Sequence, residues 1–207
     1  VYYADNASIM TNEANVGSYG MYLYNVEHAE VINNIMNGRY GMYNGNAYSQ
    51  KIYHNTLAGN TSYGMALGNN DSLDIRNNII STDNYRCFNG ILDPSSKVDY
   101  NVYYVKDTSA TNAVVYYYDF SNQYKTLADW QAYDTVRNIK SLEGDPVYYA
   151  SDDLRMFIGT IANDVGDNSV NVLTDIDGDT RPYTGSTTVD IGADEYEPLA
   201  SDLALIS

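Results

Sequence analysis

The first half of the chain repeats itself about every 22 residues, and this periodicity limits the fold more than any other feature. Each unit holds a Tyr-Gly-Met element or a relative of it, followed by a segment in which an apolar residue precedes an asparagine by three positions. The asparagines are spaced 22, 21, 23 and 23 residues apart and are Asn12, Asn34, Asn55, Asn78 and Asn101. A period of this length is typical of a solenoid, whose units bury their apolar sides only against their neighbours.

Within one unit, the apolar residues alternate with polar ones. Leu73 and Ile75 alternate with Asp74 and Arg76, a period of two that indicates strands and not helices. A leucine-rich repeat has a similar length, but its helical half is missing. The sequence therefore predicts an all-β chain, a right-handed parallel β-helix with about 22 residues per coil over residues 1–104.

The repeated asparagines are expected to hold this fold together and to bind nothing. An Asn at a bend tolerates a left-handed backbone, and its amide can bond to the same amide in the coils about 4.8 Å above and below. We therefore predict a buried asparagine ladder. Asn25, Asn46 and Asn69 each lie four residues after one of the first three Tyr-Gly-Met methionines, which predicts a second ladder at another corner.

Tyrosines recur at fixed positions of the coils and are the best functional lead. One position is occupied by Tyr19, Tyr40, Tyr63 and Tyr85, and an outward position three residues later by Tyr22, Tyr43 and Phe88. Two interpretations stay open. The rings stabilise one another as cross-strand neighbours, or they form a flat strip that contacts a glycan or another partner. Cys87 falls at the inward position of the Met residues, which predicts a buried thiol.

Charged side chains on the strand before the ladder alternate in sign from coil to coil, as Glu30, Lys51, Asp74 and Lys97. A lysine in a β-helix groove can act as the base of a lyase, but a lysine between two carboxylates is better explained as a paired surface charge. His28 and His54 have no Ser or Cys partner in matching strands. The sequence therefore favours a protein without a catalytic site.

The composition excludes some partners. The formal net charge is -16, which disfavours nucleic acid and anionic membranes, and no apolar run approaches a membrane span. One cysteine, few lysines and 23 tyrosines indicate export to the cell surface or the extracellular space. Val1 aligns with Leu23, so the chain starts within a coil. We expect this open N-terminal coil to meet other coils, another copy of the chain, or a polysaccharide.

The repeat ends near Val105. Residues 105–198 are predicted to be a C-terminal cap with irregular β structure, and residues 199–207 a tail. Residues 113–120 form a strand candidate. Residues 126–133 carry apolar residues at helical spacing around Trp130, with Thr126 as N-cap, which predicts a short helix covering the last coil.

Motifs toward the C-terminus carry a family resemblance. They read GDP-aromatic at 144–148, D-L-R at 153–155, D-V-G-D at 164–167, D-x-D-G-D-x-R-P at 175–182 and V-D-I-G-A-D-E-Y at 189–196. In this order, after the asparagine coils, they resemble the C-terminal region of secreted right-handed β-helix proteins of the choice-of-anchor Q kind. The resemblance implies a pectate-lyase-like fold, export and frequent attachment to a cell surface, and it implies no activity.

Asp175, Asp177 and Asp179 alternate around a glycine, like the start of a calcium loop. An EF-hand would need a glutamate where Ser186 stands. We expect these aspartates to accept hydrogen bonds from a tight turn, and Arg181 to pair with one of them or with an acid of the last motif. A bound Ca²⁺ is the alternative, and no cofactor is required.

Three classes of function remain. The first is a non-catalytic surface module, structural or adhesive, that assembles with itself or binds glycan through its tyrosines. The second, a polysaccharide lyase or glycoside hydrolase, rests on fold analogy alone. The third is the carbohydrate-binding part of a longer enzyme whose other coils precede residue 1.

Overall fold

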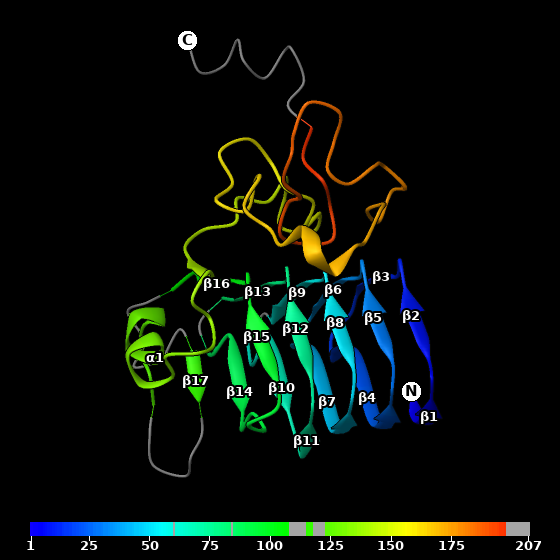
Figure 1. Cartoon of the computed structure of the whole chain (residues 1–207), viewed down its shortest axis with the longest axis vertical. Helices are drawn as coiled ribbons and strands as arrows, with labels where there is room; N and C mark the ends of the chain where they lie inside the picture. The colour runs from blue at the N-terminus through cyan, green and yellow to red at the C-terminus, as the bar shows by residue number, and fades with distance from the viewer. Residues whose placement is uncertain (60, 84, 108–114, 118–122, 198–207) are drawn as a thin grey trace.

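The chain folds into three parallel sheets that wind around one core (Figure 1). The computed structural model describes residues 1–59, 61–83, 85–107, 115–117 and 123–197. The first sheet contains β1 (Tyr2–Asp5), β4 (Tyr19–Glu27), β7 (Tyr40–Tyr48), β10 (Met65–Leu67), β14 (Phe88–Gly90) and β17 (Val115–Tyr117), with β11 (Asn70–Asp71) beside β7. The second contains β2 (Ser8–Met10), β5 (Glu30–Ile32), β8 (Lys51–Tyr53), β12 (Asp74–Arg76) and β15 (Lys97–Asp99). The third contains β3 (Glu13–Asn15), β6 (Ile35–Gly38), β9 (Thr56–Gly59), β13 (Ile79–Thr82), β16 (Val102–Val105) and β18 (Leu142–Glu143).

Strands that neighbour each other in a sheet come from successive coils. Ile9 pairs with Val31, Val31 with Ile52, and Ile52 with Ile75, always in parallel. The five strands of the second sheet thus mark five coils. The predicted all-β parallel β-helix is confirmed.

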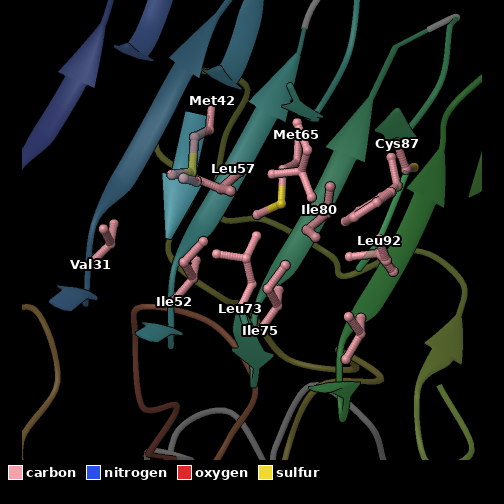
Figure 2. Close-up of a cluster of buried hydrophobic side chains, with 14 of the residues drawn as sticks. Val31, Met42, Ile52, Leu57, Met65, Leu73, Ile75, Ile80, Cys87 and Leu92 are labelled. Carbon is pink, nitrogen blue, oxygen red and sulfur yellow. The ribbon is translucent and has the colours of Figure 1, made fainter. Parts of the chain in front are cut away.

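Most inward positions place one apolar side chain per coil in the interior, and Asn44, between Leu23 and Leu67, is a buried polar exception. Figure 2 shows Met42, Leu57, Met65 and Ile80 meeting between the sheets, and each of the four is fully buried. Because each layer rests only on the layers beside it, the core is a column and not a sphere.

At Phe88 the structure differs from the expected periodicity. The sequence predicts an outward Phe88 beside Tyr22 and Tyr43, but Phe88 pairs with Met65 and is fully buried. The step from Met65 to Phe88 is 23 residues, whereas the step from Tyr63 to Tyr85 is 22. A shift of one residue turns a strand side chain to the opposite face, so Phe88 enters the core. Cys87 is buried as predicted, and its thiol donates to the carbonyl of Tyr104.

The predicted asparagine ladder is present. The Oδ1 atom of each asparagine accepts hydrogen bonds from the backbone N–H and the Nδ2 of the asparagine one coil earlier, at 2.8–3.1 Å. Asn34, Asn55, Asn78 and Asn101 are fully buried. At the end of the ladder, Ser141 Oγ takes the place of the next amide and accepts from the Asn101 N–H at 3.0 Å.

The left-handed backbone of this turn lies one residue before the ladder. Positive φ angles of 51–58° occur at the preceding positions, which are Thr11, Asn33, His54, Asn77 and Tyr100. The expectation that the ladder asparagines adopt this conformation is therefore wrong, and their role is hydrogen bonding. The left-handed backbone is found in the second ladder, where Asn25 and Asn46 have φ of 53° and 51°. Asn46 Nδ2 donates to Asn25 Oδ1 at 2.6 Å.

The last described coil is covered by α1 (Leu127–Tyr133), as predicted. Thr126 is its N-cap and forms a reciprocal capping box with Asp129. Trp130 is fully buried, with its ring 5.6 Å from that of Phe88 and 5.9 Å from that of Tyr103. Of the strand candidate at 113–120, only β17 lies within the described residues, and the remainder lies outside them.

Residues 144–197 lie along the side of the β-helix and not over its end (Figure 1, yellow to red). They include a single 3-10 turn, η1 (Asn168–Val170). Their apolar side chains pack on the third sheet, where Ile191 and Met156 meet Ile79 and Val102. We call residues 144–197 the side segment.

Polar contacts attach the side segment to successive coils. They are Arg155 to Glu13, Asn33 to the carbonyl of Thr174, the Ala193 N–H to Thr56, and Arg76 to Asp167. Each joins residues more than 90 positions apart in the sequence. The side segment therefore contacts every coil from the first to the fifth, the fifth through Val102.

We predict that Asn55→Ala lowers the free energy of unfolding by about 1–3 kcal/mol, because the buried Asn34 N–H and the Val31 carbonyl each lose a hydrogen-bond partner. Denaturant unfolding measures this loss. Asn69→Ala is the matched control, since the Asn69 side chain is exposed and donates one bond to Asn46. Equal losses in the two variants would contradict the structural role of the buried ladder.

Candidate functional site

Six tyrosines from successive coils lie together on the outer side of the first sheet. We call Tyr19, Tyr22, Tyr40, Tyr43, Tyr63 and Tyr85 the tyrosine face. β4 and β7 position the first four, because Tyr19 pairs in register with Tyr40 and Tyr22 with Tyr43. The parallel register thus places identical side chains one above the other.

The rings form two rows. In the first, Tyr19 and Tyr40 stack at 4.6 Å and 18°, Tyr40 lies 5.7 Å from Tyr63 and Tyr63 lies 5.2 Å from Tyr85. In the second, Tyr22 and Tyr43 stack at 4.9 Å and 17°. An edge contact of 5.0 Å between Tyr19 and Tyr22 joins the rows.

The stacking of the rings determines which of their surfaces a ligand can contact. Where two rings stack nearly parallel, as in Tyr19 and Tyr40, each covers a face of the other. The surface that remains is made of ring edges and phenol hydroxyls. The flat strip proposed from the sequence is therefore better described as a row of edges, with tilted rings only at Tyr63 and Tyr85.

The phenols of Tyr22 and Tyr63 are held in the protonated form at neutral pH. Burial, followed by the neighbouring Tyr2, raises the pKa of Tyr22 above its ordinary value. Burial and the neighbouring Tyr85 raise the pKa of Tyr63 in the same way. Each hydroxyl can therefore donate and accept hydrogen bonds.

Four further residues belong to this surface and were not predicted from the sequence, namely Tyr2, Tyr24, Arg39 and Arg86. Tyr2 lies 5.3 Å from Tyr22 and 6.2 Å from Tyr24. The guanidinium of Arg39 lies 5.7 Å from the Tyr40 ring centroid, and that of Arg86 lies 4.8 Å from the Tyr85 centroid. The signal for Tyr2 was present, since it precedes Tyr24 by the repeat length of 22. Nothing in the period indicated the arginines.

The residues considered for catalysis lie apart from one another. Lys51 Nζ pairs with Glu30 Oε1 at 2.8 Å on the exposed side of the second sheet. His28 Nδ1 lies 2.8 Å from Asp5 Oδ1 at the surface. His54 is fully buried beneath the side segment, where burial and then Arg181 hold its pKa well below the ordinary value, so it stays neutral.

The three aspartates proposed as a calcium loop have separate partners. Asp175 Oδ1 accepts from the backbone N–H of Asp177 and of Asp179 at 2.9 Å, and its Oδ2 accepts from the N–H of Glu195 at 3.0 Å. Asp177 pairs with Arg155 at 2.9 Å, whereas the side chain of Asp179 is exposed.

Arg181 forms a fully buried ion pair with Glu195 at 2.8 Å, one of the pairings expected for it. This geometry favours the turn over the ion-binding interpretation of the aspartates. In the described parts of the chain, no three His, Cys, Asp or Glu side chains are grouped so as to hold a metal.

Comparison with known protein families gives a match over the coils. The family model described as periplasmic copper-binding protein (NosD) matches residues 1–129, which is more than half of the chain. The chain belongs to the NosD family. No curated protein and no solved structure matches it.

The NosD match covers the five coils and ends at residue 129, within α1, so it does not include the motifs at 144–196 on which the choice-of-anchor Q resemblance depends. It agrees with the β-helix class, and a periplasmic family agrees with the predicted export. Within the described ranges, no helix is long and apolar enough to cross a membrane.

The described residues do not fit the copper in the family's description. Copper is held by imidazole and soft sulfur ligands. His28 is exposed near Asp5 while His54 is buried beside Asn77, and burial raises the pKa of the Cys87 thiol, which disfavours the thiolate. The in-register methionines are enclosed in the apolar core. These donors do not converge on one position.

We predict that chelation by EDTA leaves the melting temperature unchanged, whereas Asp175→Ala lowers it by several degrees because three backbone N–H groups lose their acceptor. Thermal melts with and without EDTA measure both effects. Asp179→Ala, which removes an exposed carboxylate, is the control. A large EDTA shift that added Ca²⁺ reverses and Asp177→Ala abolishes would establish a calcium site instead.

Proposed function

We propose that the chain is a non-catalytic module outside the cytoplasm that holds a polysaccharide against its tyrosine face. The observation that carries the proposal is the pair of tyrosine rows on one side of the β-helix, the longer of which crosses four coils. Membership in a periplasmic family supports the location.

Hydrogen bonding is the main interaction that this surface offers. Stacking along the β-helix axis occupies the faces of Tyr19 and Tyr40 and fixes the rings, so little side-chain entropy remains to be lost on binding. The hydroxyls then repeat at the coil spacing of about 4.8 Å. A polysaccharide chain carries hydroxyls in a similarly regular series and can pair with them as donor and acceptor.

The ends of the face add contacts of a different kind. The rings of Tyr63 and Tyr85 are tilted by 58° relative to each other, so they do not cover each other's faces as Tyr19 and Tyr40 do, although Arg86 lies over the Tyr85 ring. Apolar C–H surfaces of a sugar can pack there. Arg39, beside Tyr40, adds a cation to a chain whose net charge is -16. These features favour the binding of a polysaccharide that lies along the β-helix axis over the binding of a small molecule.

A non-catalytic role agrees with the placement of the acid and base candidates. Lys51 and Glu30 neutralise each other on the second sheet, and His54 is enclosed beneath the side segment. Neither lies on the tyrosine face. Hydrolysis or elimination requires an acid and a base within reach of one bond.

We predict that Tyr19→Phe/Tyr40→Phe weakens polysaccharide binding without changing the melting temperature, because it removes two hydroxyls and retains the ring stack. Affinity electrophoresis against neutral and acidic polysaccharides measures the binding. Tyr19→Ala/Tyr40→Ala should reduce both binding and stability. Tyr149→Phe, at an exposed tyrosine of the side segment, is the control.

The same polysaccharides should show no new reducing or unsaturated ends after incubation with the protein. Cleavage of any of them would contradict the non-catalytic proposal. Unchanged binding in both double variants would show that the tyrosine face is not the binding surface and that its rings have only a structural role.

A further inference from the structure

Two pairs of rings in the tyrosine face are placed for a covalent reaction with each other. Tyr19 and Tyr40 stack with their centroids 4.6 Å apart and their planes at 18°, and Tyr22 and Tyr43 stack at 4.9 Å and 17°. Each pair joins β4 to β7, where its two residues are direct partners in the parallel register. The register therefore holds two phenols of successive coils face to face.

The other ring contacts along the first row are less suited to this reaction. Tyr40 and Tyr63 lie 5.7 Å apart with their planes at 42°, and Tyr63 and Tyr85 lie 5.2 Å apart at 58°. In a near-parallel stack the ortho carbons of one ring lie against the other ring, whereas a tilted ring turns one of its edges away. The stacked pairs thus come nearest to the geometry in which two ortho carbons can bond.

An oxidant in the solvent can reach the stacked rings. Tyr19 is 38% exposed, and its three partners in the two pairs are partly exposed. Cys87 and Trp130, whose side chains compete for oxidants, are fully buried. An electron can therefore leave the tyrosine face without the oxidant entering the core, and the phenol proton can pass to water.

A disulfide cannot join two coils of this chain. Cys87 is the one cysteine of the sequence, and its buried thiol donates to the carbonyl of Tyr104. The location proposed above, outside the cytoplasm, is one in which oxidised side chains persist. Tyrosines paired in register are then the residues that an oxidant can convert into a link between coils.

We propose that the tyrosine face is a site of oxidative cross-linking, at which dityrosine bonds form between Tyr19 and Tyr40 and between Tyr22 and Tyr43. A one-electron oxidant, such as a peroxidase with hydrogen peroxide, removes one electron from each phenol, and each phenol proton passes to water. The two phenoxyl radicals combine in a bond between their ortho carbons. The hydrogen on each of these carbons then moves to the phenol oxygen through water, which restores both aromatic rings. The two electrons and two protons that leave the pair reduce one peroxide to two waters.

The bond has a consequence for stability that binding does not have. Each link closes a loop of 21 residues, from Tyr19 to Tyr40 or from Tyr22 to Tyr43. Closing such a loop lowers the entropy of the unfolded chain, as a disulfide does, so the cross-linked chain should melt several degrees above the untreated one. The reaction needs the rings and their register but no polysaccharide, so cross-linking and the proposed binding can each fail without the other.

Photo-oxidation of the full chain with persulfate and a ruthenium tris-bipyridyl sensitiser, a small one-electron oxidant, tests the proposal. The first two tryptic cleavages, after Arg39 and Lys51, place Tyr19 and Tyr22 on one fragment and their partners on the next. We expect mass spectrometry to find these two fragments joined, with the loss of two hydrogen atoms for each link. Fragmentation of the joined product places the bonds.

The yield distinguishes a reaction set by the fold from chance encounter. At about 1 µM protein, links within one chain should exceed links between chains by at least about tenfold, because groups on one chain have an effective concentration in the millimolar range. In urea, the yield of joined fragments should fall by at least about tenfold, since the rings lose the orientation that the register gives them.

Tyr40→Phe/Tyr43→Phe removes both phenols on β7 but keeps the rings, so the joined fragments should disappear while the melting temperature of the untreated chain is maintained. Tyr149→Phe, at an exposed tyrosine of the side segment, is the control and should leave the yield unchanged. Three results would overturn the proposal. They are equal yields in the folded and unfolded chains, an undiminished yield in the double variant, and products linked mainly between chains through exposed residues such as Tyr3.

Discussion

The structure depends on parallel backbone pairing between coils held in a single register. Every strand of the second sheet pairs with the equivalent strand of the next coil. Equivalent positions of the sequence repeat therefore lie in one line along the axis. The asparagine ladder enforces this register from inside the turn, because each Oδ1 meets both the N–H and the Nδ2 of the same residue one coil earlier. A slip by one residue would leave buried amides without partners.

The same register produces the tyrosine face. On the first sheet it stacks tyrosines into rows, and on the third it brings Asn37, Ala58 and Ser81 into one line beneath the side segment. The tyrosine face is therefore periodic in the coil spacing and suits a ligand that is itself periodic. The line on the third sheet is buried and serves packing, since Ala58 lies in one cluster with Leu154 of the side segment.

Features with the period of the coil could be predicted from the sequence, including the ladder and the residues of the tyrosine face. Cys87 is buried as expected, but Phe88 and not Cys87 takes the position next to Met65 that the period assigned to it. The helix around Trp130 could also be predicted, since its N-cap and apolar spacing are local signals. The outward position expected for Phe88 was wrong because one additional residue in that coil reverses its side chain. The position of the side segment depends on contacts such as that of Arg76 with Asp167, which are 91 residues apart and cannot be inferred from the repeat.

The attachment of the side segment to all five coils has a mechanical consequence. A solenoid whose coils contact only their neighbours can open one coil at a time from an end. Here Glu13 of the first coil and Val102 of the fifth are joined to the same segment, through Arg155 and through Met156 and Ile191. A tensile load applied along the axis must therefore shear several widely spaced anchors together before any single coil can peel away. Such a molecule resists pulling as one body.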